Sequence, residues 1–537
     1  MNKKGFTLIE LLAVIVILAI IALIATPIVI SIIDDSRKEA AERSAESYLN
    51  AVENAIMKDR MESELIEDGT YKIVNGQLEG TTLEVEISGE YPTDGRVSIV
   101  DGKVDINGTS MIIGDYSVSF DGQGNIQVGK KPELEYYNDI YQIIGNINSG
   151  NSNGTGEVSG ENAEFAYYVD ENDKPNLVIL KDLELESEFV LSTDMIIDLG
   201  GKTLAFDNEL GIKVTSGDVT IKGEAAGSKV VVSNDTQAST VLKVDSGSCT
   251  ISGGTYQADS NGIGTDQTTD NNIVVGSTGT LIIDNAKILS NDTEGGTLVG
   301  VYVNNGGTAT VTNSDIEINS LNGLKSDGIR NYGTMTLTNT SIAAYSNYTA
   351  NAAKNDYATS TRGINNEGTM ILKNCYVYGA HSGIRSLGTL YVDGGTYEGY
   401  GHGGFYFGGA STTSYVKNAT VRLSDIKVGY DDGIAGSNKA GFYVGGASNI
   451  TIYVDKCEIS GSYYPFVLRS SGGESNNNVY ISNSNINKDT MERYIRNDGS
   501  SNKVYIGVGN NFGIVESYKE SGSIETTDNY SSQFPEY

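Results

Sequence analysis

Apolar and polar residues form successive patterns along the chain, and the first is a long apolar run. Residues 6–33 read FTLIELLAVIVILAIIALIATPIVISII, with Glu10 as the single charged side chain. Residues 34–61 then carry apolar side chains three and four positions apart between charged ones, which is the spacing of an amphipathic helix. No Gly or Pro interrupts residues 34–61, so we expect one helix to continue from the apolar run through this segment. Its expected buried stripe is Ala40, Ala41, Ala45, Tyr48, Leu49, Val52 and Ile56.

Short alternating segments replace the helical pattern between residues 71 and 128. Segments such as YKIVNG, TTLEVEIS and GRVSIVDGKVDING alternate apolar and polar residues, with DG and NG dipeptides between the runs. Such dipeptides are typical of β-hairpins. We therefore expect a small antiparallel sheet that ends near residue 130, and a short helix within 133–146. The stretch 146–162 is rich in Gly, Ser and Asn and predicts a flexible linker.

A repeated segment of ten residues dominates the chain from residue 247 onward. Its copies include GTLIIDNAKI (279–288), GTATVTNSDI (307–316), GTMTLTNTSI (333–342) and GTMILKNCYV (368–377). Alignment of the copies gives a column of aliphatic residues, a column that is mostly Asn, and a column of small residues. The Asn column consists of Asn285, Asn313, Asn339, Asn374, Asn418 and Asn483, with Gly253, Gly394 and Lys456 as exceptions.

These columns predict a right-handed parallel β-helix, because each coil of short strands buries its inner face only by stacking on its neighbours. Asn at a bend tolerates the left-handed backbone conformation, and its side chain can hydrogen-bond to the next coil. The segment 176–206 contains IDLGGKTL and resembles the cap and first coil of bacterial surface β-helix proteins. We expect about 11–13 coils at a spacing near 4.8 Å. Loops of variable length, such as 344–361 and 424–439, are expected to leave one side.

Charge and cysteine content narrow the functional classes. The chain has 37 Lys+Arg and 69 Asp+Glu, which gives a net charge of −32 and argues against a nucleic-acid partner. Cys249, Cys375 and Cys457 are too few for a disulfide scaffold, and we expect all three to be small buried residues. Cys375 and Cys457 align three coils apart, which is too far for a disulfide.

The apolar run is long enough to cross a membrane once. Its 28 residues would form a helix of about 42 Å, longer than the hydrocarbon core of about 30 Å. Lys3 and Lys4 before the run, with Asp34 and Asp35 after it, predict a cytoplasmic N-terminus. Pro27 removes one helical hydrogen bond and is expected to bend the helix.

Glu10 is the residue of this run that needs an explanation. A carboxylate inside the membrane costs about 2.5–3.5 kcal/mol on insertion scales, so it should have a partner. One interpretation is a shallow helix end with Glu10 among the lipid headgroups. The other is that the chain is cut before Phe6, so that the new amine lies four residues from this carboxylate or faces it from a neighbouring subunit.

The residues Lys3-Lys4-Gly5-Phe6-Thr7-Leu8-Ile9-Glu10, with the apolar helix behind them, resemble the N-terminus of type IV pilins and pseudopilins. The resemblance implies cleavage by prepilin peptidase between Gly5 and Phe6 and N-methylation of Phe6. It implies that Glu10 pairs with the amine of a neighbouring subunit during assembly, and that Pro27 is the family's helix-bending proline. It covers roughly the first 60 residues firmly and extends to about residue 130.

The expected fold is therefore mainly β, with a long N-terminal helix and a small pilin-like antiparallel sheet ahead of the parallel β-helix. We place a prepilin leader at 1–5, the helix and pilin-like sheet at 6–130, a linker at 131–162 and the β-helix at 163–537. The precursor is expected to span the cell membrane once and the mature protein to lie in an extracellular filament or at the cell surface. Few cysteines and a two-lysine leader favour a Gram-positive cell.

An enzymatic alternative comes from polysaccharide lyases and hydrolases that share the parallel β-helix. The weak candidates for catalysis are Asp431, Asp432 and His402, since carboxylates beside a His element could act as acid and base. Their order is reversed relative to the polygalacturonase-like pattern, and the pair lies in a Gly-rich loop, so we expect no catalytic residue. The acidic stretch 170–173 and the Asp431–Asp432 pair could bind Ca²⁺, but neither has calcium-loop spacing, so we expect no metal or cofactor.

Aromatic residues near the C-terminus suggest a binding surface for a glycan or a protein. Alternate residues of a strand point outward, while the rest are expected to stack inside. The residues in question are Tyr400, Phe405, Tyr406, Phe407, Tyr430, Phe442, Tyr443, Tyr463 and Tyr464. The leading hypothesis is a minor, tip-located pilin with an adhesive β-helix. Its alternatives are the surface enzyme and a pseudopilin of a secretion or DNA-uptake machine.

Overall fold

The structure is a computed structural model, and its described residues fall into two compact units. The described residues are 8–61, 66, 68–87, 89–120, 125–131, 133–150, 162–170, 173–234, 239–260, 269–292, 297–320, 326–346, 361–399, 403–423, 440–460, 464–469, 476–486, 495–498, 500–511, 518–519, 523–526 and 531–535. The first unit holds residues 1–133 and 169–173, and the second holds residues 134–168 and 174–537.

The first unit is one long helix packed on a small sheet. Helix α1 (Leu8–Met61) runs without interruption through Pro27, as the two apolar and amphipathic patterns predict. The sheet has the order β2-β1-β3-β4-β5-β6 and its pairs are antiparallel. The strands are β1 (Gly69–Val74), β2 (Gln77–Leu78), β3 (Asp94–Val100), β4 (Lys103–Ile113), β5 (Tyr116–Phe120) and β6 (Ile126–Lys130).

The second half of α1 buries one stripe of side chains in the core of this unit. Ala41, Ala45, Tyr48, Val52 and Ile56 are buried there with apolar residues of the sheet. The predicted stripe is right for these residues, and Leu49 packs against the same core. Ala40 is exposed instead, because it lies one position outside the stripe of helical spacing.

Segment 81–87, predicted as a strand, forms no strand in the structure. Its alternation is real, because Leu83 and Val85 are buried in the core. The prediction fails on hydrogen bonding. The side-chain amide of Gln77 donates to the carbonyl of Val85 at 3.3 Å and accepts from its N–H at 3.3 Å. A side chain thus replaces the neighbouring strand that the pattern implied.

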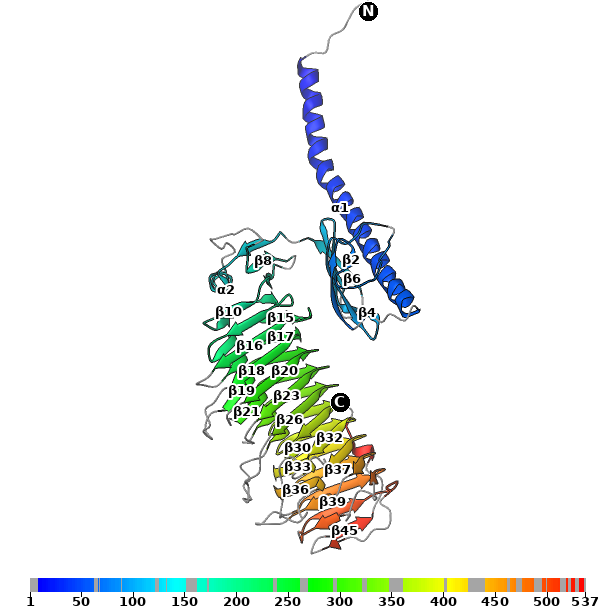
Figure 1. The fold of residues 1–537 in the computed structure, drawn as a ribbon, viewed down its shortest axis with the longest axis vertical. Helices are drawn as coiled ribbons and strands as arrows, with labels where there is room; N and C mark the ends of the chain where they lie inside the picture. The colour runs from blue at the N-terminus through cyan, green and yellow to red at the C-terminus, as the bar shows by residue number, and fades with distance from the viewer. Residues whose placement is uncertain are drawn as a thin grey trace, which may run out of the picture. The chain divides into compact units, whose positions relative to one another are not determined.

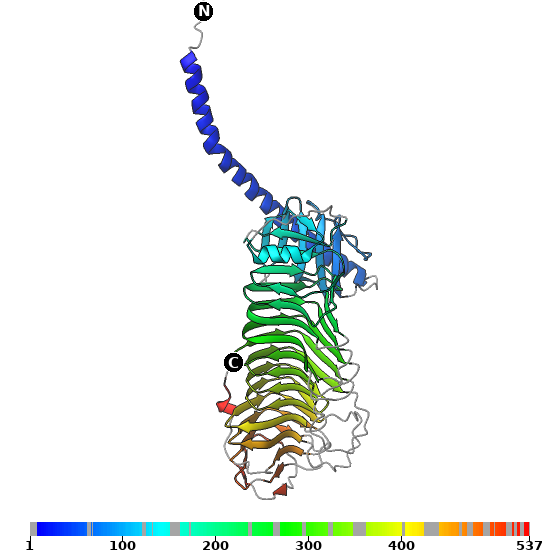
Figure 2. The same cartoon turned by 90° about the vertical axis from the view of Figure 1, so that its left-hand side faces the viewer.

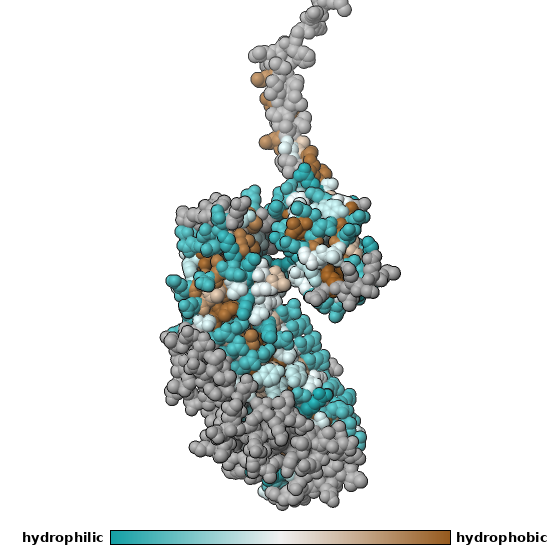
Figure 3. Space-filling model, in the orientation of Figure 1, coloured by the Kyte–Doolittle hydropathy of each residue, from teal (hydrophilic) through white to brown (hydrophobic). Residues whose placement is uncertain are grey.

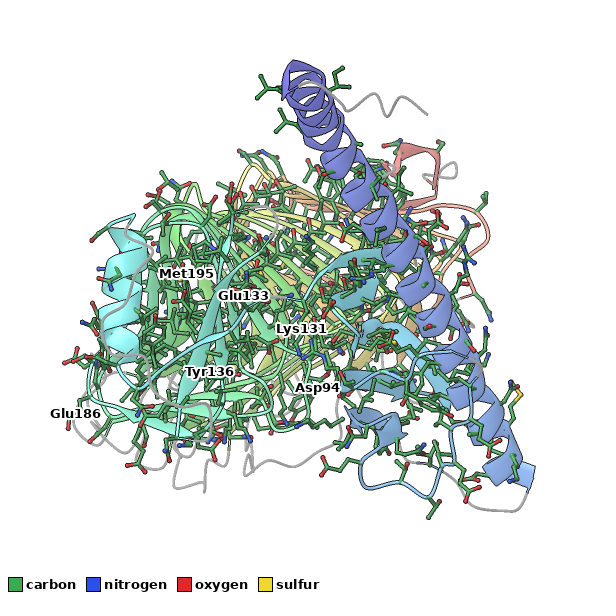
Figure 4. The ribbon with its side chains drawn as sticks, turned by 90° about the horizontal axis from the view of Figure 1, so that it is seen from above. Asp94, Lys131, Glu133, Tyr136, Glu186 and Met195 are labelled. Carbon is green, nitrogen blue, oxygen red and sulfur yellow. The ribbon has the colours of Figure 1, made fainter. Side chains whose placement is uncertain are left out.

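The second unit begins with a short strand and a helix that close one end of its core. Strand β7 (Glu135–Tyr137) pairs antiparallel with β8 (Phe165–Val169), and helix α2 (Ile140–Asn148) lies between them in sequence. Asp139 caps α2 by accepting a hydrogen bond from the N–H of Gln142 at 3.0 Å. Figure 4 looks down the coils with Tyr136, Glu186 and Met195 labelled around this end.

Four isoleucines of α2 join the core of the β-helix, which differs from the linker assigned to 131–162. They are Ile140, Ile143, Ile144 and Ile147, and Tyr141 makes an edge contact with Phe189 at 5.6 Å. The expected helix within 133–146 begins later, at Ile140. Residues 151–161 of the proposed linker lie outside the described residues.

The rest of the second unit is a stack of coils, as Figures 1 and 2 show. A typical coil has three strands. In one coil these are β24 (Asp327–Asn331), β25 (Thr334–Thr338) and β26 (Ser341–Ser346). Each strand pairs in parallel with its counterpart in the next coil, so the coils build three faces. We call them face A, face B and face C after β24, β25 and β26. The parallel β-helix predicted from the repeat is confirmed.

In the described residues, face C is a sheet of twelve strands. The strands of faces A and B are hydrogen-bonded into one other sheet. Strands β17 (Thr240–Gly253) and β19 (Thr269–Asp284) are long enough to contribute to both A and B. Face A further contains β11 (Phe189–Leu191), β14 (Leu210–Val214), β21 (Thr297–Val303), β27 (Arg362–Asn366), β30 (Ser382–Ser386), β33 (Gly403–Ala410), β36 (Ala440–Ser448), β39 (Tyr464–Leu468), β42 (Ile495–Asn497) and β44 (Tyr518–Lys519).

The remaining strands complete faces B and C. Face B contains β9 (Pro175–Ile179), β12 (Met195–Asp198), β15 (Asp218–Gly223), β22 (Thr308–Thr312), β28 (Thr369–Lys373), β31 (Thr389–Asp393), β34 (Thr413–Lys417), β37 (Thr451–Asp455), β40 (Asn478–Ser482), β43 (Lys503–Ile506) and β45 (Ser523–Thr526). Face C contains β10 (Leu183–Leu185), β13 (Thr203–Phe206), β16 (Lys229–Asn234), β18 (Thr255–Ser260), β20 (Lys287–Asp292), β23 (Asp315–Ser320), β29 (Tyr376–Gly379), β32 (Thr396–Gly399), β35 (Thr420–Leu423), β38 (Glu458–Ser460) and β41 (Asn485–Ile486).

The aliphatic column lies in register inside face B. Ile251, Ile283, Val311, Leu337 and Leu372 pair coil upon coil and have no measurable exposure. At about 25 cal/mol per Å² of buried apolar surface, burial of such a continuous column stabilises the stack. Each coil depends on the next one for this burial.

The Asn column forms the corner between faces B and C, as predicted. Its φ angles are 51° at Asn285, 49° at Asn313, 48° at Asn339, 52° at Asn374, 54° at Asn418 and 49° at Asn483. Gly253, Gly394 and Lys456 share the positive φ. The side chains also bridge coils, since the amide of Asn339 donates to Asn313 at 3.3 Å and that of Asn418 donates to Asp393 at 2.6 Å.

All three cysteines are free and buried, as expected for small apolar residues. Cys375 and Cys457 occupy the small column directly after the Asn corner. Burial raises the pKa of the Cys249 thiol to about 12 and that of the Cys457 thiol to about 12. These thiols are therefore held in the protonated, unreactive form.

Candidate functional site

The N-terminal cleavage and assembly residues are only partly visible in the structure. Gly5 and Phe6 lie outside the described residues. Glu10 and Pro27 lie on α1, and their side chains lie outside the described part. The roles that the resemblance implies for these four residues stay predictions.

Most of the described side chains in the first half of α1, up to Ile33, are apolar, and all of them are exposed. Figure 3 shows brown apolar atoms along this part of the helix. Leu23 is 78% exposed, and Leu12, Val16, Ile17, Val29, Ile32 and Ile33 are between 47% and 62% exposed. Apolar surface on successive turns favours burial in lipid or against other helices. Counting only described side chains, we find no helical stretch with the length and hydropathy of a membrane span.

A hydrogen bond attaches the sheet to α1 just after the apolar run. The Tyr116 hydroxyl on β5 donates to the Asp34 carboxylate at 2.6 Å. This bond lowers the pKa of Asp34 below its usual value and raises the pKa of Tyr116. Tyr116 is buried and Asp34 is half-buried, so the bond fixes the sheet against the helix at this point.

The weak catalytic candidates are not placed by the structure. Asp431, Asp432 and His402 all lie outside the described residues. Of the acidic stretch 170–173, the N–H of Asp173 donates to the carbonyl of Asp170 at 3.1 Å, which is a tight turn. Over the described ranges, no three acidic, His or Cys side chains gather as metal ligands would.

The aromatic residues predicted as an outward patch are mostly covered. Phe405, Phe442 and Phe466 stack inside face A with ring centroids 5.1 Å and 5.0 Å apart. Tyr406 and Tyr443 occupy the outward positions and stack at 5.4 Å.

Tyr443 is nevertheless only 5% exposed and Tyr464 only 2%, because they form a small core of their own with Ala440 and Val467. The expectation of an exposed surface at these residues is therefore wrong. Tyr400, Tyr430 and Tyr463 lie outside the described residues.

A different set of aromatic residues, missed from the sequence, forms an outward ladder on face B. It consists of Tyr391, Tyr415, Tyr453, Tyr480 and Tyr505, one in each of five successive coils. Successive ring centroids lie 5.3, 5.1, 4.9 and 4.5 Å apart. The signal was present in the segments TLYVD, TSYVK, TIYVD, NVYIS and KVYI, which repeat Tyr between two inward residues. We call this set the tyrosine ladder.

Face A carries a buried ion-pair cluster that the sequence analysis also missed. The Asp327 carboxylate has no exposed surface and accepts hydrogen bonds from Arg330 at 2.7 Å and Arg362 at 3.3 Å. Two coils from Arg330, Arg385 contacts Asn365 at 2.8 Å and Glu367 at 3.4 Å. The cluster bridges adjacent coils, because Asp327 and Arg330 lie on β24 while Arg362 lies on β27, and removal of one partner would leave an uncompensated buried charge.

Comparison with known proteins identifies the N-terminus. Residues 1–26 match the family described as the prokaryotic N-terminal methylation motif. No curated protein matches the chain. The motif indicates processing of the type IV pilin kind, and in this chain it precedes a parallel β-helix.

Proposed function

We propose that the chain is a minor pilin or pseudopilin that assembles through α1 and presents its β-helix at the cell surface. In this proposal prepilin peptidase cuts between Gly5 and Phe6, the new terminus is methylated, and Glu10 pairs with the amine of a neighbouring subunit. The observation that carries it is the match of residues 1–26 to the methylation motif.

The exposed apolar residues of α1 support assembly through this helix. Leu12, Val16, Ile17 and Leu23 lie on its first turns with about half or more of their surface exposed. They would enter the membrane in the precursor and pack against neighbouring helices in the filament. A carboxylate at Glu10 would then be neutralised by a partner's amine rather than left alone among apolar groups.

The β-helix supports a role in display. It is much larger than the sheet on α1, and its 375 proposed residues would crowd a filament if every subunit carried them, so the proposal is a low-copy, tip-located subunit. Its surface would bind a glycan or a protein ligand. We propose no catalytic residue, metal or cofactor for it, no nucleic-acid partner, and a Gram-positive cell surface as its location.

Processing and assembly have a direct test. The mature protein from the cell envelope should begin at Phe6 and carry the extra mass of one methyl group, by N-terminal sequencing and intact mass spectrometry. Glu10→Ala should still insert into membranes but fail to enter filaments. Glu39→Ala is the matched control, since Glu39 is an exposed helix residue whose carboxylate pairs with Arg43 at 2.9 Å. Mature protein that begins at Met1, or normal assembly of Glu10→Ala, would contradict the proposal.

The enzymatic alternative has its own test. The triple substitution of Asp431, Asp432 and His402 by Ala should leave polysaccharide unaffected, because the unaltered protein should not cleave it. Release of reducing ends or unsaturated products by the unaltered protein, lost in the triple variant, would favour a surface lyase or hydrolase instead.

A further inference from the structure

The tyrosine ladder presents ring edges rather than ring faces to its surroundings. Neighbouring rings are within 13° of parallel, and all five side chains are partly buried. Tyr415, Tyr453 and Tyr480 each have a ring against both faces. A flat sugar ring cannot therefore stack on them, while their hydrogen-rich edges remain available to the face of another aromatic ring.

The chain's own C-terminal segment meets the ladder in this way. Phe534 makes edge contacts with Tyr415 at 5.8 Å and 66° and with Tyr453 at 6.4 Å and 71°. Pro535 lines a small pocket with Phe534, Tyr391 and Tyr415. The interplanar angles are those of the favourable edge-to-face arrangement.

This contact requires the chain to turn back along the stack. Strand β45 pairs with β43, β43 with β40, and β40 with β37, the strand that carries Tyr453. The segment therefore returns across three coils, about 14 Å at the spacing of paired strands. Figures 1 and 2 show the short red helix Ser531–Gln533 well back along the stack from the last strands.

Two features of the contact between Phe534 and the tyrosine ladder favour reversible binding. Phe534 and Pro535 stay partly exposed where they lie on the ladder, so little apolar surface holds them. Proline also restricts Phe534 to extended conformations, which reduces the ordering cost of each docking event. The pocket also contains two basic residues, Lys373 and Lys417, and the Lys417 ammonium lies 3.1 Å from the Asp393 carboxylate. In the sequence, the acidic residue Glu536 follows Pro535.

We propose that the tyrosine ladder is a peptide-docking site that recognises a Phe-Pro segment by its aromatic ring. The resident ligand is this chain's own segment 531–535, bound within the molecule and displaceable by the same segment supplied in trans. This site is independent of the assembly proposed for α1.

The test uses the full chain in detergent micelles and a fluorescent peptide of residues 528–537, DNYSSQFPEY. The Phe534→Ala substitution vacates the site. The Phe534→Ala chain should therefore bind the peptide with an apparent Kd at least about tenfold lower than the Kd of the unaltered chain, whose site is mostly filled. Fluorescence anisotropy measures the difference. A second variant that ends after Thr526 should bind like Phe534→Ala.

Matched controls separate specific recognition of the phenylalanine ring from non-specific binding of the peptide. Tyr453→Ala in the Phe534→Ala chain should abolish binding, while Tyr302→Ala should not, because Tyr302 lies on β21 of face A and makes a tilted contact with Tyr332 at 5.7 Å. A peptide with Ala in place of the phenylalanine should not bind. The proposal is overturned if the Phe534→Ala chain, folded by circular dichroism, binds no better than the unaltered chain, or binds the Ala peptide equally well.

Discussion

Tyr116 and Asp34, 82 residues apart in sequence, are joined by a hydrogen bond of 2.6 Å from the phenol to the carboxylate. Asp34 is the first residue after the apolar run, and Tyr116 begins β5. The bond thus attaches the sheet at the point where α1 leaves its apolar half. Because it lowers the pKa of Asp34, it also links this attachment to pH.

Removal of the Tyr116 hydroxyl should return the pKa of Asp34 toward 3.8. The folded pKa lies below the unfolded one, so the contribution to stability is present above pH 3.8 and is lost as the pH falls through the folded value. NMR titration of the Asp34 carboxyl carbon in Tyr116→Phe checks the shift. Tyr91→Phe is the control, since the Tyr91 hydroxyl contacts the N–H of Ile87. An unchanged Asp34 titration in Tyr116→Phe would assign the shift to another group.

Ile282 and Ile283 on β19 offer a matched pair for the aliphatic column. Ile283 has no exposure and Ile282 is 41% exposed. Ile283→Ala should lower the free energy of unfolding by about 2–5 kcal/mol, and Ile282→Ala by no more than about 0.5 kcal/mol. Chemical unfolding followed by far-UV circular dichroism measures both. Equal losses would mean that the two faces of this strand are not packed differently.

The repeat could be read from sequence because one residue type is required at one backbone conformation. Asn285, Asn313 and Asn339 all adopt positive φ at the same corner, so the column itself reports the bend. The aliphatic column follows from strand alternation in the same way. Both are local requirements that recur in every coil, so the residues that meet them recur at regular places in the sequence.

The features that were missed depend on the surroundings of a residue. Tyr406 and Tyr443 point outward, as alternation predicts. Tyr443 is nevertheless covered by a second small core, which the spacing of apolar residues in the sequence does not predict. Segment 81–87 alternates like a strand, but Gln77 takes its hydrogen bonds. The contact of Phe534 with Tyr453 joins positions far apart in sequence and has no repeat to reveal it.

Substitution at the Asn corner should separate backbone strain from loss of a side chain. Asn339 has φ of 48°, and Gly394 holds the equivalent position two coils away. Asn339→Ala keeps a side chain with a Cβ atom in the left-handed region but removes the amide that compensates for it. This substitution should lower the free energy of unfolding by about 1–2 kcal/mol. Asn339→Gly should cost less, because glycine adopts this φ freely. The same unfolding measurement ranks them, and a loss for Asn339→Gly as large as that for Asn339→Ala would show that the amide bond to Asn313 matters more than the bend.

Asp327 should be far more sensitive to substitution than a surface acid of the same cluster. It has no exposed surface, and its removal leaves the guanidiniums of Arg330 and Arg362 without their shared carboxylate. Asp327→Ala should therefore lower stability by about 3–5 kcal/mol. Glu367 is one-third exposed and 3.4 Å from Arg385, so Glu367→Ala should cost no more than about 1 kcal/mol. Comparable unfolding midpoints for the two variants would contradict the burial assigned to Asp327.

The three cysteines should not react with thiol reagents while the β-helix is folded. Burial holds the pKa of Cys249 at about 12 and that of Cys457 at about 12, and it also raises the pKa of Cys375. At pH 8 the thiolate fraction is then small, and the reagent has no path to the sulfur. Iodoacetamide followed by mass spectrometry should find no modified cysteine in the native chain and three after denaturation. Ile282→Cys is the positive control, because its exposed position should give one modified residue in the native state. Rapid labelling of Cys375 or Cys457 without denaturant would mean that the coils around the Asn corner open far more often than their packing implies.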